Sequence, residues 1–109
     1  MTMPPLSEKD WMHQVTDLAS KLGWYYLHIR AGMTADSWRT PISGPLGKGF
    51  PDLLLVRPRD VRILALELKR DGAKATPDQL AVLEILAASG METGVYAPAQ
   101  FDALLAVLR

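Results

Sequence analysis

The sequence predicts a single α/β domain in which a mixed β-sheet is flanked by helices. Three segments, residues 7–22, 76–89 and 98–109, carry apolar residues at the spacing of an amphipathic helix. Between them lie short runs rich in apolar, β-branched and aromatic residues, bounded by Gly, Pro and Asp, as is typical of strands. At 109 residues and 49% hydrophobic content, the chain fits one compact domain over 1–109. The predicted order is α-β-β-β-α-β-α.

The first helix is expected over residues 7–22, with Ser7 as its N-cap and Gly23 as its stop. One face of this helix carries the apolar residues Trp11, Met12, Val15, Leu18, Ala19 and Leu22. Glu8 precedes this stripe by one helical turn, so its side chain projects from the first turn beside apolar positions. The alternative is a favourable negative charge at an exposed helix N-terminus.

A strand is expected over residues 24–29, followed by a long loop over 30–49 that has no sustained periodicity. Because structureless loops of this length are usually functional or disordered, we expect the loop to be flexible. Residues 50–56 and 61–69 then form two apolar runs joined by a turn, the pattern of a β-hairpin. The run over 53–56 is continuously apolar, which predicts a strand covered on both faces.

The second helix has a clear start, with Thr76 as N-cap and Gln79 at the capping-box position, and it stops at Gly90. Residues 93–97 are expected to form the last strand, and Pro98 begins the final helix. The apolar face of that helix consists of Phe101, Leu104, Leu105 and Leu108. This face either covers the sheet of its own chain or serves in a homodimer.

The chain contains no cysteine, which excludes disulfide frameworks, thiolate zinc sites and cysteine nucleophiles. A metal ion would therefore be held by Asp, Glu, His or backbone oxygen, and hard divalent cations are the default candidates. No apolar run approaches the roughly 20 residues of a membrane span, and the N-terminus lacks a signal-type pattern. We therefore expect a cytoplasmic protein with no membrane contact.

The net charge is zero and the pI is near 6.7, which argues against a simple basic protein that coats nucleic acid. The charge is nevertheless uneven along the chain. Residues 30–74 hold nine basic and five acidic side chains, an excess of four positive charges. This segment is either a surface that attracts a polyanion or an ordinary solvated face.

Asp52, Glu67 and Lys69 form the combination most suggestive of chemistry. Glu67 and Lys69 stand two apart in the predicted strand, so they point to one face with Cα atoms about 6.6 Å apart. The same face carries the apolar residues Val61, Ile63 and Ala65, which predicts a buried row. Hairpin pairing can bring Asp52 beside Glu67, and two such carboxylates can bind Mg²⁺ or Mn²⁺ and cut a phosphodiester with help from Lys69. The alternative is a structural Glu67–Lys69 ion pair and an ordinary turn aspartate.

The order of these features resembles the VRR-NUC (virus-type replication-repair nuclease) domain, a branch of the PD-(D/E)xK nuclease superfamily. The resemblance is carried by Glu8, Gln14, His28, Arg30, Gly49, Phe50, Pro51, Asp52, Glu67, Leu68, Lys69 and Gln79. It spans about residues 7–90. The resemblance implies a restriction-endonuclease-like fold and a Mg²⁺-dependent DNA endonuclease, with Mn²⁺ as a substitute.

The resemblance also implies roles for individual residues. Glu8, Asp52 and Glu67 become acidic site residues, and Lys69 becomes the catalytic lysine. The metal ligands would be Asp52, Glu67 and the backbone carbonyl of Leu68, with Glu8 acting through a water molecule.

Five further residues are candidates for substrate binding. Gln79 is implied by the resemblance, although it can equally be the capping-box partner of its own helix. His28 and Arg30 can contact a phosphate near the site, and the alternative for His28 is a structural role. In the long loop, Arg39 and Lys48 can contact the nucleic-acid backbone while Trp38 stacks on a base; a disordered loop without function is the competing interpretation.

The favoured function is thus an endonuclease acting on branched or flapped DNA, as a Holliday-junction or repair nuclease of a bacterial or phage-infected cell. Its expected partners are DNA, a second copy of the chain and a helicase or replication protein. The first alternative is a non-catalytic DNA-binding accessory subunit. A nucleotide-binding enzyme ranks below both, because residues 44–49 have a Gly-Lys pair but neither the spacing of a P-loop nor a following Ser or Thr.

Overall fold

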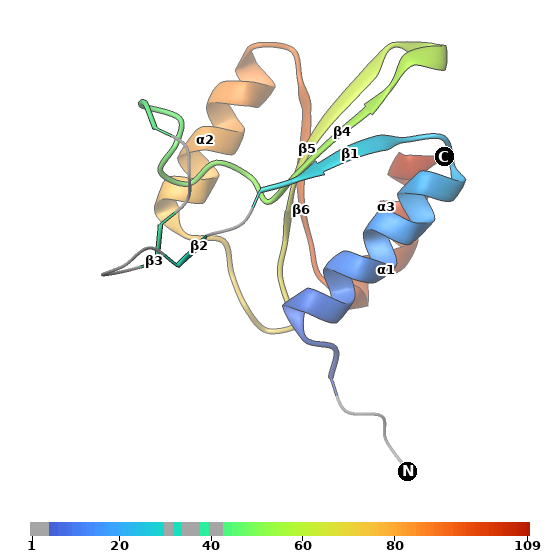
Figure 1. The fold of residues 1–109 in the computed structure, drawn as a ribbon, viewed down its shortest axis with the longest axis horizontal. Coiled ribbons are helices and arrows are strands. Elements are labelled where there is room, and N and C mark those ends of the chain that lie inside the picture. The colour runs from blue at the N-terminus through green and yellow to red at the C-terminus, as the bar shows by residue number, and fades with distance from the viewer. Residues whose placement is uncertain (1–4, 30–31, 34–37, 40–42) are drawn as a thin grey trace.

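The computed structural model describes residues 5–29, 32–33, 38–39 and 43–109 (Figure 1). The elements are α1 (Glu8–Lys21), β1 (Tyr25–His28), β2 (Gly32–Met33), β3 (Trp38–Arg39), β4 (Leu53–Arg57), β5 (Arg62–Leu68), α2 (Pro77–Ala88), β6 (Glu92–Tyr96) and α3 (Phe101–Leu108). Two 3₁₀ turns, Pro58–Asp60 and Pro98–Gln100, join β4 to β5 and β6 to α3. The predicted α/β class is confirmed.

The main sheet is mixed, with strand order β1-β4-β5-β6. β4 runs antiparallel to both β1 and β5, whereas β6 runs parallel to β5 after the crossover through α2. The predicted hairpin is therefore present as β4 and β5. The long loop differs from the prediction, because β2 and β3 within it pair as a separate two-stranded antiparallel sheet.

Helices cover both faces of the main sheet. α1 and α3 lie on one face and α2 lies on the other (Figure 1). The larger core joins apolar side chains of α1 and α3 to alternate residues of β4 and β5, among them Trp11, Leu53, Leu66 and Leu104. Leu104 and Leu108 of the apolar face of α3 thus pack on the sheet of their own chain, as one of the two predicted alternatives had it, while Phe101 of the same face is 38% exposed.

The α2 face of the sheet is covered over only part of its area. Ala65, Val82 and Leu86 form a small core there, whereas Val61 at the far end of the same row is 88% exposed. The prediction of an entirely buried row was therefore wrong, because the β4–β5 hairpin extends beyond the reach of α2 (Figure 1). For the same reason, the even-numbered residues of β4, Leu54 and Val56, are only half-buried rather than covered on both faces.

Local sequence signals account for the helix boundaries. The Ser7 hydroxyl accepts a hydrogen bond from the backbone N–H of Asp10 over 3.1 Å and so caps α1. Thr76 and Gln79 form the predicted reciprocal capping box of α2. None of the helices in the described ranges is long and apolar enough to cross a bilayer.

Candidate functional site

The two predicted metal carboxylates lie at the same end of the hairpin. Leu53 of β4 pairs with Leu66 of the antiparallel strand β5. The residue before Leu53, Asp52, therefore lies beside the residue after Leu66, Glu67. Asp52 is half-buried, and its Oδ2 atom accepts a hydrogen bond from the backbone N–H of Leu68 over 3.2 Å. The hairpin register therefore brings Asp52, Glu67 and the backbone of Leu68 into one place.

The side chain of Glu67 is completely buried, with an exposed fraction of 0%. Its Oε1 atom accepts a hydrogen bond from Gln79 Nε2 over 3.2 Å and lies 3.8 Å from Lys69 Nζ. The other oxygen, Oε2, is buried without a hydrogen-bond partner among the described residues. An unpaired buried carboxylate oxygen is costly, so this atom marks a place where a cation or a proton would be favourable.

The electrostatic setting of Glu67 favours its protonated form when no metal is bound. Burial, followed by the neighbouring Asp52 carboxylate, raises the pKa of Glu67 to about 9, while the Lys69 ammonium acts in the opposite direction. The Glu8 carboxylate adds a smaller contribution that also raises this pKa. Glu8 is therefore an electrostatic neighbour of Glu67, although its own side chain is exposed in the first turn of α1.

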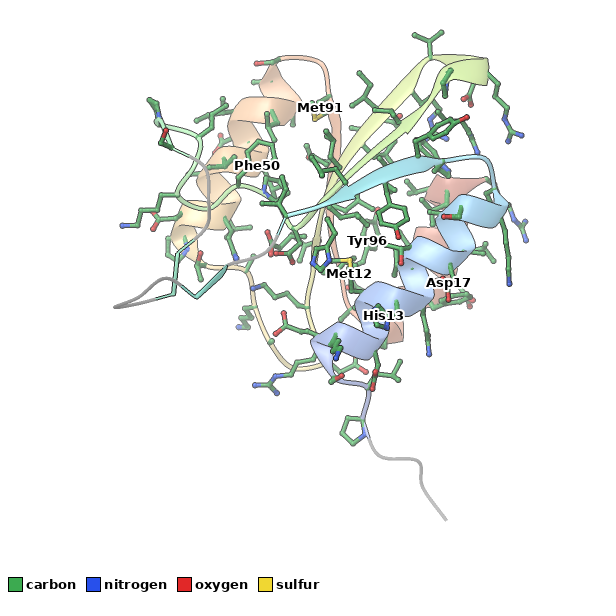
Figure 2. All side chains as sticks on the ribbon, viewed as in Figure 1. Met12, His13, Asp17, Phe50, Met91 and Tyr96 are labelled. Carbon is green, nitrogen blue, oxygen red and sulfur yellow. The ribbon has the colours of Figure 1, made fainter. Side chains whose placement is uncertain are left out.

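A cleft of about 730 Å³ opens next to these groups. Its walls come from α1, the end of β1, the segment 43–50 and the start of α2. Figure 2 shows Met12 and His13 on α1 and Phe50 across from them. The lining residues are Glu8, Lys9, Met12, His13, Thr16, Tyr26, His28, Ile29, Gly47, Gly49, Phe50, Asp52, Leu68 and Gln79. The cleft thus combines acidic, basic and aromatic side chains.

Four polar lining residues, Lys9, His13, Thr16 and Tyr26, were not among the predicted site residues. His13 is exposed on α1 and lines the cleft. Lys9, His13 and Thr16 recur at helical spacing beside the Glu8 position, so this periodicity could have identified the α1 wall. Nothing comparable in the sequence marks Tyr26, because its placement depends on how β1 meets α1.

The donor set fits a hard divalent cation. Two carboxylates, Asp52 and Glu67, converge with the backbone of Leu68, and Mg²⁺ prefers oxygen ligands of this kind. The buried, unpartnered Oε2 atom of Glu67 supports this fit. Within the described ranges, no cluster of three or more His, Cys, Asp or Glu side chains is placed to hold a metal by itself. A backbone oxygen or water would have to complete the coordination.

The other predicted site residues occupy different positions. Gln79 and His28 line the cleft. Lys48 lies outside the lining and is 86% exposed, and its ammonium pairs with Asp78 over 3.4 Å. Arg30 lies outside the described residues. Arg39 and Trp38 form β3, and their side chains lie outside the described part of the structure.

Comparison with known proteins gives a consistent assignment. The VRR-NUC domain family matches residues 32–99, which is more than half of the chain. A solved structure described as a VRR_NUC domain protein superposes with a TM-score of 0.65 at 23% identity, covering 96% of this chain and 87% of its own. A second, described as a VRR_NUC domain, gives a TM-score of 0.57 at 25% identity, covering 86% of this chain and 92% of its own.

No curated protein matches the chain. The two structural neighbours share the arrangement of a mixed sheet flanked by helices. The family match covers β4, β5 and α2, and with them Asp52 just before β4, Glu67 on β5, Lys69 just after β5 and Gln79 on α2. The family resemblance inferred from the sequence is confirmed, and with it a nuclease-type, DNA-related function is indicated. This chain belongs to the VRR-NUC domain family.

Proposed function

We propose that this protein is a Mg²⁺-dependent DNA endonuclease that cuts branched or flapped DNA. The observation that carries the proposal is the buried Glu67 carboxyl, with one unpartnered oxygen, beside Asp52 at the edge of a cleft large enough for nucleotides. Carboxylates are rarely buried without a partner, and a functional site is the common reason when they are.

Asp52, Glu67 and the backbone carbonyl of Leu68 would hold the cation, with Glu8 reaching it through a water molecule. When bound, Mg²⁺ supplies Lewis-acid polarisation of a phosphate oxygen, and Mn²⁺ can take its place. Asp52 is fixed for this role by the Leu68 N–H, and Glu67 is fixed by Gln79. The two carboxylates thus need little rearrangement to act together.

Lys69 supplies the positive charge of the site. Its ammonium lies 3.8 Å from Glu67 Oε1, and its backbone N–H donates to the Tyr96 carbonyl over 3.0 Å. A lysine held there can orient an attacking water and stabilise the negative charge that develops on the phosphate.

The dimensions of the cleft support a substrate with unpaired nucleotides. A volume of about 730 Å³ is in the range of sites that take in one or a few nucleotides rather than a whole duplex. A single strand can enter, with its phosphates near Lys9, His13 and His28 and a base against Tyr26. Flaps and junctions present such strands next to a duplex, which is why we favour them over linear duplex DNA.

The wider setting of the proposal rests on the family resemblance. We propose DNA as the main partner, with Arg30, Arg39 and Lys48 contributing contacts to its phosphate backbone. A Holliday-junction or repair role in the cytoplasm of a bacterial or phage-infected cell follows from the same source. A second copy of the chain and a helicase or replication protein are the proposed protein partners.

The decisive experiment compares cleavage of labelled linear, flapped and four-way-junction DNA with Mg²⁺, Mn²⁺ or EDTA. Glu67→Gln and Lys69→Met are expected to lower the rate by more than about 100-fold, because each removes a group at the reacting phosphate. Glu84→Gln on the exposed side of α2 is the matched control and should cleave like the wild type. Cleavage of branched DNA should exceed that of linear duplex.

A non-catalytic DNA-binding subunit is the second candidate, and the Lys69–Glu67 ion pair is the observation that favours it. In that case no DNA would be cut with any metal, while binding would persist in Glu67→Gln and Lys69→Met. Retained DNA binding without cleavage would therefore replace the nuclease proposal.

A further inference from the structure

The side-chain amide of Gln79 makes two hydrogen bonds in opposite directions. Its Oε1 atom accepts from the backbone N–H of Thr76 over 2.8 Å, and its Nε2 atom donates to Glu67 Oε1 over 3.2 Å. One amide therefore completes the N-terminal cap of α2 and also holds the buried carboxyl of β5. The two sequence interpretations of Gln79, helix cap and site residue, apply together.

We infer that Gln79 is a positioning residue that fixes Glu67 so that Oε2 is the oxygen left for a divalent cation. The inference rests on the proposed metal-dependent function and adds to it that the two oxygens of Glu67 have different roles: Oε1 bonds to protein groups and Oε2 binds the cation. Oε1 accepts a hydrogen bond from Gln79 Nε2 and lies 3.8 Å from Lys69 Nζ, whereas Oε2 has no hydrogen-bond partner among the described residues. Groups that orient a metal ligand in this way normally govern how tightly the metal binds.

The orientation of the amide is determined by the cap. An amide can often be turned end for end, but here its oxygen must face the Thr76 N–H, so its NH₂ group must face Glu67. The Thr76 hydroxyl in turn accepts the Gln79 backbone N–H over 3.2 Å, which fixes the base of the side chain. The cap thus orients Gln79 Nε2 toward Glu67 whether or not a metal is bound.

The first turn of α2 is itself held in place by the segment 43–50. Gly49 has φ +90°, and a Cβ atom there would lie only 2.6 Å from the backbone of Asp78. Lys48 adds the exposed ion pair with Asp78 across the same contact. The Gln79 amide therefore extends from a helix turn that is packed closely against segment 43–50, which suits the positioning of a metal ligand.

The test measures metal binding directly, in the absence of DNA. Mn²⁺ affinity is determined by electron paramagnetic resonance for the wild type, Gln79→Met and Gln100→Met. Gln100 is the matched control, because its amide also caps a turn, accepting from the Ala97 N–H over 2.9 Å, but bonds no carboxyl. We expect Gln79→Met to weaken Mn²⁺ binding about 10-fold to 100-fold, and Gln100→Met to leave it within about two-fold.

A further variant separates positioning from capping. Thr76→Ala removes the hydroxyl cap of α2 but keeps the Thr76 N–H that faces the Gln79 amide oxygen, so it should lower the thermal midpoint while weakening Mn²⁺ binding far less than Gln79→Met does. If Thr76→Ala weakens binding as much as Gln79→Met, or if Gln79→Met binds like the wild type, the inference is overturned. If the wild type binds no Mn²⁺, the proposed metal site fails together with it. Intact Mn²⁺ binding in both variants would overturn the inference alone.

A measurement on chains that retain Gln79 covers the case in which Gln79→Met does not fold. The side-chain ¹H–¹⁵N resonances of Gln79 should shift when Mg²⁺ is added and in Glu67→Gln, because the Nε2–Glu67 bond responds to both changes. The amide resonances of Gln14, exposed on α1, and Gln100 should not move. Absence of both Gln79 shifts would overturn the inference.

Discussion

The carboxylate of Asp52 accepts a hydrogen bond from the backbone N–H of Leu68, at 3.2 Å between Oδ2 and N. This bond joins the start of β4 to the end of β5, one residue beyond Glu67. Asp52 is consequently held beside Glu67 by backbone geometry and strand register rather than by a flexible side chain alone. When both are ionised, the two carboxylates repel each other, and a bound cation would favour that ionised pair by relieving the repulsion.

Mg²⁺ should therefore stabilise the fold, and Asp52→Asn should abolish most of that effect. At a Mg²⁺ concentration 100 times its Kd, the gain in unfolding free energy of the wild type is about 2.7 kcal/mol. The asparagine can still accept from Leu68 but carries no charge, so affinity for the cation falls. Urea unfolding with and without Mg²⁺ measures both values. Asp17→Asn, on the exposed side of α1, should respond to Mg²⁺ like the wild type; an equal response in Asp52→Asn would refute the assignment.

Arg57 should be among the most important residues for stability. Its guanidinium is 2% exposed, pairs with both oxygens of Asp60 at 2.9 Å and donates to the carbonyls of Leu22 and Leu108. It also stacks 4.4 Å from the centre of the Trp24 ring. Arg57→Met removes the Asp60 ion pair and a donor to the half-buried Leu22 carbonyl, and it leaves the Leu108 carbonyl with Trp24 Nε1 as its remaining side-chain donor among the described residues. These losses should lower the free energy of unfolding by about 3 kcal/mol.

The exposed neighbour Arg59 is the control for this substitution. Arg59→Met should change the free energy of unfolding by no more than about 0.5 kcal/mol, because it loses no buried partner. Urea denaturation of both variants decides the question. Equal effects would show that the contacts of Arg57 contribute little.

Two ion pairs, Arg57–Asp60 and Arg62–Glu92, should make the fold sensitive to acid. The hydrogen bond from Arg57 lowers the pKa of Asp60, and that from Arg62 lowers the pKa of Glu92. A carboxylate with a lowered native pKa contributes stability above its unfolded pKa, and this contribution is lost as the pH falls through the native value. The double variant Asp60→Asn, Glu92→Gln should therefore lose less stability between pH 6 and pH 2 than the wild type. An identical loss in urea midpoint would contradict this.

Gly49 should tolerate alanine less well than Gly44. Both residues have a positive φ, +90° and +99°, so either substitution strains the backbone by about 1 kcal/mol. A Cβ atom at Gly44 would meet nothing within 4 Å, whereas at Gly49 it would collide with the backbone of Asp78. Gly49→Ala should cost about 3 kcal/mol in total, and thermal or urea unfolding would show the difference. Equal costs would mean that segment 43–50 can move away from α2.

Several features of the fold were predictable because their causes are local. The caps of α1 and α2 follow from Ser7, Thr76 and Gln79, whose side chains bond backbone groups three residues away. The hairpin of β4 and β5 follows from two apolar runs and a short turn, and its register brings Asp52 beside Glu67. Local rules failed for Val61, which is exposed because no helix reaches that end of the sheet.

By itself, the sequence determined the order of the main elements, the family and the meeting of two carboxylates at one strand end. These follow from capping, side-chain alternation and hairpin pairing, which act over short distances along the chain. Only the tertiary structure decided that Arg57 is buried, that Lys48 pairs with Asp78 and that Gln79 reaches Glu67. The packing of α1, α2 and α3 against the sheet sets these contacts. Residues that are distant in the chain therefore determine which side chains line the cleft and which oxygen of Glu67 has no hydrogen-bond partner among the described residues.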